Sequence, residues 1–203
     1  MFKNNISIMK FPEYVRFLWW QAVATAKLKK NGVSLGAEIR FYGIPIVSTT
    51  ANGEMSIGAR CHLVSNTEFT ALGVNHPVIL RLLRPGASIQ IGTDTGISGA
   101  SICAALSIEI GANVLLGANV IITDTDFHSI KPAGRRYNMD TDEIKAVPVF
   151  IGNNVFIGAN VLLLKGSRIG ENSVVGAGSV VTGKIPSNVI AAGNPARVIR
   201  AIS

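Results

Sequence analysis

The chain has 203 residues, of which 48% are hydrophobic and 15% are charged. This length suits one good-sized domain with a short appendage and gives no reason to expect a second core. A net charge of +7 fits an anionic ligand, an anionic membrane surface or nucleic acid, but it is equally a means of solubility. No basic stripe interleaved with aromatic residues accompanies it, so nucleic-acid binding finds no support.

The N-terminal segment predicts one helix. Residues 1–17 hold no apolar run of the length found in secretory signals, and no later stretch is apolar enough to span a membrane, so we expect a cytoplasmic protein. Residues 12–30 begin at Pro12, end in lysines and are followed by Gly32, which is typical of a helix. Such a helix fits a cap over the end of a solenoid better than a contact with a membrane surface, although both readings are open.

A six-residue spacing of large apolar residues begins at Val33 and is interrupted twice. The first insertion covers about residues 65–86 and the second about residues 123–148. The spaced residues before the second insertion are Leu35, Phe41, Val47, Ile57, Leu63, Ile91, Ile97, Cys103, Ile110, Leu116 and Ile122. Cys61 and Cys103 both lie in these segments, where we expect free thiols that behave as small hydrophobes.

After the second insertion the spacing is unbroken. An aliphatic residue occupies every sixth position at Ile151, Ile157, Leu163, Ile169, Val175 and Val181. The residue three positions later is one that enters the left-handed region at low cost, namely Asn154, Asn160, Asn172 or Gly178. A period of six fits a chain that forms a short strand, bends and returns to the same face of a coil. We therefore predict a parallel β-helix over residues 33–203, preceded by a helical cap over residues 1–32.

The repeats and three further motifs resemble the hexapeptide-repeat acyltransferases. The motifs are TDTDFHSI in the second insertion, IGNNVFIGANVLLLKGSRIGENSVVGAGSVVT and VIAAGNPARVIR. The resemblance covers residues 33–200 and is close to the maltose and galactoside O-acetyltransferases, and closer to polysaccharide O-acetyltransferases of bacterial surface-glycan clusters. It implies a left-handed coil, which is an exception to the right-handed crossover rule. It also implies acetyl-coenzyme A as donor, a saccharide acceptor, and a homotrimer with active sites between neighbouring prisms.

The second insertion contains the candidate base. The resemblance places the catalytic histidine of the family in this loop, and His128 is the loop's only histidine. A neutral imidazole can take the proton of a sugar hydroxyl as the hydroxyl attacks a thioester. Asp124 and Asp126 precede it, and either carboxylate, or a backbone carbonyl, is a candidate to orient the ring. Arg135 and Arg136 are candidates to bind substrate, or equally to form salt bridges with the acidic residues of the loop.

The first insertion contains the second polar group. In the resemblance, a neighbouring loop or coil positions the hydroxyl or steadies the oxyanion, and Asn75 and His76 are the candidates here. The alternative is an Asx-Pro turn that caps a short helix over the sequence VILRLL. His62 lies in a repeat, where a role in the wall is expected.

The coenzyme needs backbone amides along a groove and cations for its phosphates. Small residues at the bends of the last coils let the pantetheine approach the main chain. By resemblance, the candidate residues are Gly158, Ala159, Lys165, Gly176, Ala177, Lys184, Pro195 and Arg197. No metal is expected.

The sequence fits two other functions less well. Gamma-class carbonic anhydrases also use stacked hexapeptides and bind zinc through three histidines, but the histidines here lack a close pair. A scaffold or a glycan-binding module would need neither the loop of His128 nor a coenzyme-type tail. We therefore predict an acetyl-coenzyme A-dependent O-acetyltransferase that transfers directly to a saccharide.

Overall fold

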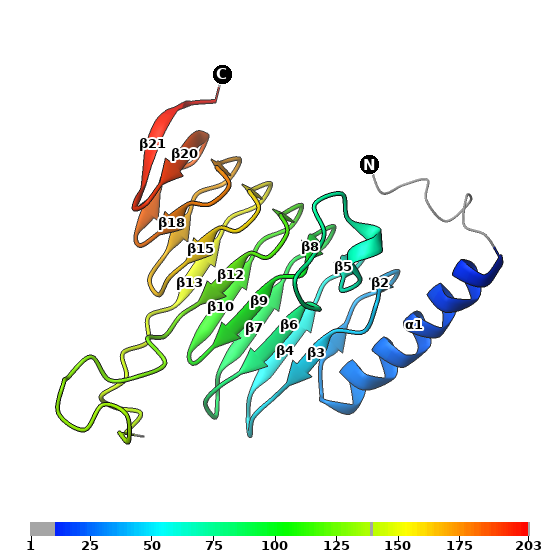
Figure 1. The fold of residues 1–203 in the computed structure, drawn as a ribbon, viewed down its shortest axis with the longest axis horizontal. Helices are drawn as coiled ribbons and strands as arrows, with labels where there is room; N and C mark the ends of the chain where they lie inside the picture. The colour runs from blue at the N-terminus through cyan, green and yellow to red at the C-terminus, as the bar shows by residue number, and fades with distance from the viewer. Residues whose placement is uncertain (1–10, 139, 203) are drawn as a thin grey trace.

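The chain forms a three-sided prism of parallel strands with a helix at one end (Figure 1). In this computed structural model, residues 11–138 and 140–202 are described. Three sheets of seven, eight and six strands make the faces, which we name A, B and C. Each circuit of the chain adds one strand to every face in the order A, B, C, and this confirms the predicted parallel β-helix.

The strands of each face follow one another along the prism axis. Sheet A contains β1 (Ser34–Leu35), β4 (Glu54–Ile57), β7 (Ser88–Ile91), β10 (Ser107–Ile110), β13 (Val149–Ile151), β16 (Arg168–Ile169) and β19 (Lys184–Ile185). Sheet B contains β2 (Arg40–Tyr42), β5 (His62–Val64), β8 (Gly96–Ser98), β11 (Leu115–Leu116), β14 (Phe156–Ile157), β17 (Val174–Val175), β20 (Val189–Gly193) and β21 (Ala196–Ala201). Sheet C contains β3 (Ile46–Ser48), β6 (Ile79–Leu82), β9 (Ser101–Ala104), β12 (Ile121–Thr123), β15 (Leu162–Leu163) and β18 (Val180–Val181).

The spaced aliphatic residues form the core of the prism. Ile151 is in register with Ile110 on one side and Ile169 on the other. All three side chains are buried in one continuous hydrophobic cluster that runs through the coils. Each sixth side chain therefore stacks on its counterpart in the next coil, as expected for a solenoid whose repeats contact only their neighbours.

The backbone bend at the edge between sheets A and B explains why the repeat contains glycine and asparagine. Asn154 and Asn172 have φ angles of 56° and 60°, in the left-handed region, and each side chain hydrogen-bonds the asparagine of the next coil. A Cβ atom on Gly92 would lie 2.5 Å from the backbone nitrogen of Ala112 in the next coil. Close stacking of coils thus requires glycine at the start of this bend.

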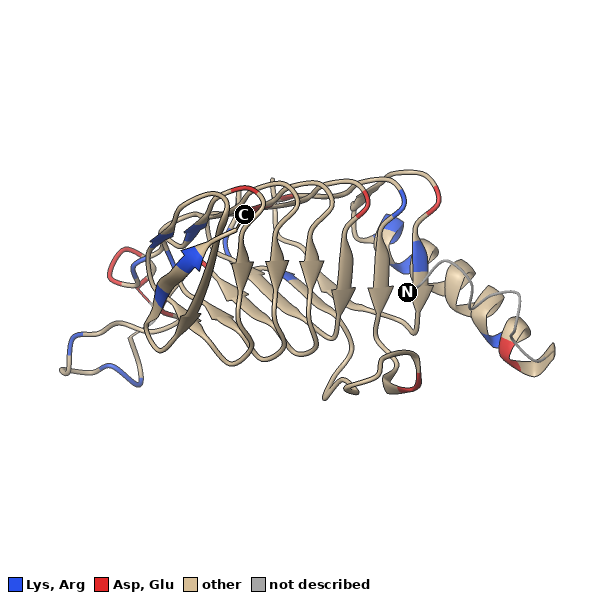
Figure 2. Ribbon diagram, turned by 90° about the horizontal axis from the view of Figure 1, so that it is seen from above, with Lys and Arg blue, Asp and Glu red and all other residues tan. Residues whose placement is uncertain are grey.

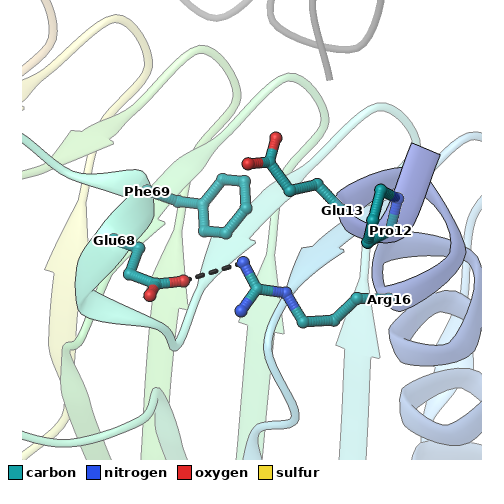
Figure 3. A pocket seen from close by; sticks show the side chains of 5 residues that line it. All are labelled: Pro12, Glu13, Arg16, Glu68 and Phe69. Atoms are coloured by element: carbon teal, nitrogen blue, oxygen red, sulfur yellow. Dashed lines mark hydrogen bonds and ion pairs between the residues drawn. The ribbon is translucent and has the colours of Figure 1, made fainter. Parts of the chain in front are cut away.

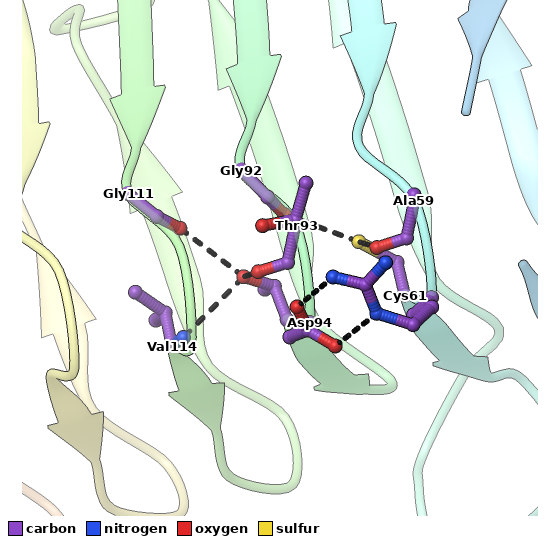
Figure 4. A network of polar contacts seen from close by, with 9 residues as sticks. Ala59, Cys61, Gly92, Thr93, Asp94, Gly111 and Val114 are labelled. Atoms are coloured by element: carbon purple, nitrogen blue, oxygen red, sulfur yellow. Dashed lines mark hydrogen bonds and ion pairs between the residues drawn. The ribbon is translucent and has the colours of Figure 1, made fainter. Parts of the chain in front are cut away.

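The same edge carries a polar network in the earlier coils (Figure 4). Arg60 forms two hydrogen bonds to the carboxylate of Asp94, of 2.8 and 2.6 Å. Beneath them, Thr95 donates to the carbonyl of Gly111 and the buried thiol of Cys61 lies 3.1 Å from the carbonyl of Gly92. The network ties successive coils together, and both cysteines are free, as the sequence indicates.

Two details of the predicted repeat are wrong. Residues 79–82 form β6, which pairs with β3 and β9 and belongs to the wall, so the first insertion ends before it and VILRLL is no helix. Ile102 rather than Cys103 points into the core, since Ile102 is fully buried and Cys103 is half-buried. Both errors arise at bends that differ by a residue or more from the regular hexad.

The predicted N-terminal helix is α1 (Phe11–Lys30), which packs on the first coil. Its buried residues are Phe17, Trp20, Ala24 and Leu28, whereas its other side exposes Phe11, Tyr14, Val15, Leu18 and Trp19. Within residues 11–138 and 140–202, no helix is both long and apolar enough to cross a membrane. The absence of a secretory signal is predicted from residues 1–17, of which residues 1–10 lie outside the described part of the chain.

Candidate functional site

The second insertion leaves the prism between β12 and β13, at the edge between sheets C and A (Figure 1). A short antiparallel neck closes it, because Thr125 forms a β-bridge with Ala146 and the N–H of Val147 donates to the carbonyl of Asp124 at 2.8 Å. The guanidinium of Arg84, from the same edge two coils earlier, donates to the carbonyl of Ile144 at 2.7 Å. The base of the loop is therefore fixed to the wall.

Asp124 holds the turn of the preceding coil and does not contact His128. Its side chain is fully buried and accepts hydrogen bonds from the backbone N–H groups of Ala105 and Leu106, at 2.6 and 2.7 Å. Burial raises the pKa of this carboxyl, and the two backbone donors oppose that rise. The geometry gives Asp124 a structural task at the start of the insertion.

Replacing Asp124 by Asn should destabilise the protein. The amide of Asn offers one acceptor oxygen, so one backbone donor at Ala105 or Leu106 would face an NH₂ group. A buried donor without an acceptor costs about 1–3 kcal/mol, and the melting temperature should fall by roughly 3–10 °C. Thermal unfolding of Asp124→Asn beside Asp126→Asn checks this, since Asp126 is only partly buried. Equal melting temperatures for these two variants would contradict the structural role.

Asp126 is also engaged elsewhere. Its carboxylate forms an ion pair with the ammonium group of Lys165, which lies in the next turn at the same edge of the prism. Lys165 was predicted to bind the coenzyme, and Asp126 was one candidate to orient His128. The ion pair joins the two instead, so neither carboxylate of the motif contacts the imidazole.

His128 stands exposed on the insertion, beside a strained residue. The preceding Phe127 has a φ of 61°, a left-handed conformation that bulky side chains rarely adopt. Strain of this kind costs about 1–3 kcal/mol and gathers at functional sites, where surrounding contacts hold it. Here the N–H of Phe127 faces the hydroxyl of Thr125 at 3.4 Å. The backbone is thus bent immediately before the candidate base.

The predicted arginine pair lies at the far end of the insertion. Arg135 donates to the backbone carbonyls of Ile130 and Lys131, and the Arg136 guanidinium lies 5.8 Å from the centre of the Tyr137 ring. Neither forms an ion pair with a described acidic residue, since Glu143 pairs with Lys131 instead. Both charges are exposed, which leaves a role in substrate binding open.

The first insertion lies along the edge between sheets B and C and carries His76. The Nδ1 of His76 is 2.8 Å from the carbonyl of Pro77, and Nε2 is 3.5 Å from the hydroxyl of Ser101 in β9. Because a carbonyl only accepts, Nδ1 carries the proton and Nε2 is left as an acceptor. The N–H of Asn75 donates to the side chain of Asn119 at 2.8 Å, which fixes the loop to the bend two coils further along the prism.

Contacts with α1 hold the other end of this insertion, at η2 (Thr67–Phe69). Arg16 forms an ion pair of 2.7 Å with Glu68, and the rings of Trp20 and Phe69 meet edge to face at 5.5 Å. Figure 3 shows the hollow that Arg16, Glu68 and Phe69 form with the first turn of the helix. A second hollow of about 430 Å³ lies beside it, lined by Trp20, Asn75 and His76 among others.

The residues predicted for the coenzyme fall mainly on one edge. Gly158 and Ala159 follow β14, Gly176 and Ala177 follow β17, and Pro195 lies in the hairpin after β20, all at the edge between sheets B and C. This is the edge that also carries Asn75 and His76. Lys165 and His128 lie at the other edge of sheet C, Lys184 begins β19 just beyond it, and Arg197 lies in β21.

The three histidines do not assemble a metal site. His62 is in β5, His76 is in the first insertion and His128 is in the second. Among residues 11–138 and 140–202, no three His, Cys, Asp or Glu side chains come close enough together to hold a metal ion. Burial lowers the pKa of His62, which agrees with a residue of the wall.

Comparisons with known proteins show which repeat families the coils match. Residues 148–183 match the bacterial transferase hexapeptide model (six repeats), and residues 89–124 match the hexapeptide repeat of succinyl-transferase. The galactoside O-acetyltransferase of Escherichia coli (strain K12) is 42% identical over 100 residues, which are 48% of this chain and 45% of that protein. The chain therefore spans about half the length of the curated relatives it matches.

Two solved structures share the fold over more of the chain. A maltose O-acetyltransferase from Clostridium difficile 630 has a TM-score of 0.54 and 29% identity, over 88% of this chain and 74% of that one. A galactoside acetyltransferase in complex with coenzyme A has a TM-score of 0.52 and 25% identity, over 96% of this chain and 84% of that one. The coils, the two repeat matches and these neighbours identify the chain as a left-handed β-helix of hexapeptide repeats, similar to the galactoside and maltose O-acetyltransferases.

Proposed function

We propose that the chain is an O-acetyltransferase that uses acetyl-coenzyme A and acetylates a saccharide. The observation that carries the proposal is the single histidine on a fixed, strained loop at the edge of a hexapeptide coil. The relatives support it, because they include a galactoside O-acetyltransferase, a maltose O-acetyltransferase and a galactoside acetyltransferase in complex with coenzyme A. A polysaccharide precursor is the acceptor that the motifs favour.

In the proposed reaction His128 acts as general base. Its free imidazole nitrogen takes the proton of the acceptor hydroxyl while the hydroxyl oxygen attacks the thioester carbonyl. The tetrahedral oxyanion then collapses, the carbon–sulfur bond breaks, and the thiolate of coenzyme A leaves with the proton. Direct transfer needs no acetyl-enzyme, and exposure of His128 on its loop leaves room for both substrates. Asp124 and Asp126 fix the base of the loop to the neighbouring coils and do not contact the imidazole of His128.

Asn75 and His76 are proposed to steady the oxyanion or to position the acceptor. With its Nδ1–H donated to the carbonyl of Pro77, His76 keeps Nε2, which lies 3.5 Å from the hydroxyl of Ser101, as the nitrogen proposed to accept from a sugar hydroxyl. The hollow of about 430 Å³ beside it has room for a sugar ring, and it is lined by an indole and by polar side chains. We propose that the pantetheine arm of the coenzyme lies along the edge between sheets B and C, against the small residues Gly158, Ala159, Gly176 and Ala177.

A homotrimer is proposed because the two candidate groups lie on different edges of one prism. His128 is at the edge between sheets C and A, whereas Asn75, His76 and the bends with small residues are at the edge between sheets B and C. In a closed three-fold ring, one edge of each copy can face the other edge of its neighbour. The outward rows of sheets B and C also expose Leu115, Phe156 and Ile121, which an interface would cover.

The charge of the last coils supports an anionic ligand. Residues 149–203 contain five cationic residues and one acidic residue, so most of the excess positive charge of the protein lies there. Figure 2 shows lysines and arginines on the strands at this end of the prism. Lys184 and Arg197 remain the proposed contacts to the coenzyme phosphates, whereas Lys165 would first have to leave Asp126.

A thiol-release assay tests the proposed activity. The protein is mixed with acetyl-coenzyme A and a panel of mono- and oligosaccharides, and free thiol is measured against a sample without acceptor. We expect release that depends on at least one sugar, and a rise in melting temperature with the coenzyme alone. No release with any acceptor, together with an unchanged melting temperature, would contradict the acetyltransferase and favour a scaffold.

We also propose three further features of the protein. They are the division into a cap (residues 1–32) and a β-helix domain (residues 33–203), the cytoplasmic location, and contact of α1 with a membrane surface. Contact of α1 with a membrane surface is supported by its exposed side. That side carries Phe11 and Trp19, and the last turn of the helix carries Lys29 and Lys30.

A further inference from the structure

A cation from the wall of the prism holds each limb of the second insertion. On the outgoing limb, the ammonium group of Lys165 forms an ion pair with the carboxylate of Asp126. On the returning limb, the guanidinium of Arg84 donates to the backbone carbonyl of Ile144 at 2.7 Å. Lys165 follows β15, one coil after the insertion, and Arg84 follows β6, two coils before it. The insertion is therefore held from both directions along the axis of the prism.

The turn that carries Lys165 is itself fixed. The N–H of Gly166 donates to the carbonyl of Val147 at 2.9 Å, so this turn also contacts the returning limb. Ser167 is fully buried, and its hydroxyl closes the turn with a hydrogen bond of 2.6 Å to a backbone carbonyl within it. The side chains of Lys165 and Asp126 are 31% and 22% exposed, so water and salt screen their attraction less than that of a pair on the open surface.

His128 lies between two fixed points of the chain. Two residues before it, Asp126 is held by Lys165 and donates its N–H to the carbonyl of Lys145 at 3.1 Å. The residue directly after it, Ser129, is 1% exposed. His128 itself is exposed, and none of residues 11–138 and 140–202 hydrogen-bonds its ring. The place of the imidazole is therefore set by the backbone on either side of it and not by contacts of the ring.

A base placed in this way is sensitive to small movements of its backbone. A general base works only within hydrogen-bond reach of the proton, and a misplacement of about 1 Å can cost roughly a hundredfold in rate. Exposed loops open locally at low free energy, and the neck of this insertion is short, with a β-bridge between Thr125 and Ala146. Asp126 is the next residue after this bridge. Without its ion pair, the outgoing limb would be free to move between the bridge and His128.

We propose that Lys165 and Asp126 are positioning residues for His128. Their ion pair fixes the outgoing limb against the coil that follows, and the contact of Arg84 fixes the returning limb, so that the imidazole is presented at one place. The assignment rests on the proposed function, since only the transfer reaction requires a placed base. It gives Lys165 a task at the loop, whereas the sequence predicted a contact with the coenzyme.

The test is a cycle of variants at the two residues, namely Lys165→Met, Asp126→Asn and the double variant. We expect each single variant to lower the turnover number about tenfold, while the KM values and the affinity for coenzyme A stay within about twofold of the wild type. The double variant should lose no more than either single variant, because all three remove the same interaction. Lys165→Arg should keep most of the turnover, since a guanidinium also pairs with a carboxylate.

Lys145→Met is the matched control. Lys145 lies exposed on the returning limb, and among residues 11–138 and 140–202 its side chain forms no ion pair or hydrogen bond. The variant removes the same charge from the same edge of the prism, so its turnover should stay at the wild-type level. A loss in Lys145→Met equal to that in Lys165→Met would overturn the proposal, because charge and not the ion pair would then be the cause.

Titration calorimetry with coenzyme A separates the positioning role from a direct contact with the coenzyme. If Lys165 bound the coenzyme, Lys165→Met would weaken binding about tenfold or more, and Asp126→Asn would strengthen it by releasing the lysine. Opposite effects of the two variants on affinity would therefore overturn the proposal. Parallel losses of turnover at unchanged affinity support it.

Hydrogen exchange reports on the loop without any need for turnover. The N–H groups of Asp126 and Val147 donate to carbonyls across the neck. Mass spectrometry of peptides from residues 123–148 should show faster exchange in Lys165→Met and Asp126→Asn than in the wild type and the control, with peptides of the coils unchanged. Wild-type exchange in Lys165→Met would overturn the proposal. A wild type that releases no thiol would refute the acetyltransferase, and the exchange would still decide whether the ion pair fixes the loop.

Discussion

His128→Ala is expected to lower turnover by about a hundredfold or more. Removal of the imidazole leaves the acceptor hydroxyl without a base, so its oxygen attacks the thioester only as a neutral, poor nucleophile. The side chain is exposed and forms no hydrogen bond with the described residues, so its loss should not disturb the coil. Steady-state thiol release, measured with saturating coenzyme and the best acceptor of the panel, gives the ratio of turnover numbers.

Two measurements make this result specific to the base. The melting temperature, its rise with coenzyme and the oligomeric mass of His128→Ala should match those of the wild type. The variant loses only the interaction between the base and the acceptor proton, which is made in the transition state. His62→Asn serves as a histidine control in the wall of the prism, where no catalytic role is assigned. Near-normal turnover of His128→Ala would contradict the mechanism, and a comparable loss in His62→Asn would show that the effect is not confined to the loop.

Gly92→Ala is expected to cause a large loss of stability for the addition of a single methyl group at a bend. The added Cβ atom would lie 2.5 Å from both the nitrogen of Ala112 and the carbonyl carbon of Gly111. Neither atom can move aside, because both follow β10 and coils are stacked on both sides of that strand. Overpacking costs about 1–3 kcal/mol or more, so the melting temperature should fall by roughly 5–10 °C.

Gly183→Ala is the matched control. Its Cβ would meet no heavy atom within 4 Å, and its backbone is not in the left-handed region. This variant should melt at or slightly above the wild-type temperature, since alanine restricts the unfolded chain. If both variants melted together, close stacking of the coils could not be the reason for glycine at the bend.

The fold could be predicted from the sequence because the spacing of the core residues is nearly exact. Where the hexads are regular, as from Ile151 to Val181, each predicted core residue is buried. Where a bend is shorter or longer by a residue the prediction fails, and Cys103 was placed inward in place of Ile102. The run VILRLL was ambiguous for a similar reason, since a short apolar run fits a helix or a strand until its partners are known.

The candidate site could be predicted only in part. The resemblance named His128 and the loop, and these stay predictions that the geometry supports. The contacts of Asp124 and Asp126 could not be predicted, because Ala105 lies in an earlier coil and Lys165 in a later one. The contact of Arg84 with Ile144 was hidden in the same way, since sixty positions separate the two residues.

The last strand has a consequence for how copies of the protein can associate. β21 runs antiparallel to β20 and lies at the end of sheet B, so the parallel stacking of coils stops there (Figure 1). At the opposite end, α1 lies on the first coil. A coil open at both ends would present unpaired backbone groups to a second molecule and could grow into a fibre. Removal of residues 196–203 would expose such an edge, and the solenoid itself would become the seed of aggregation.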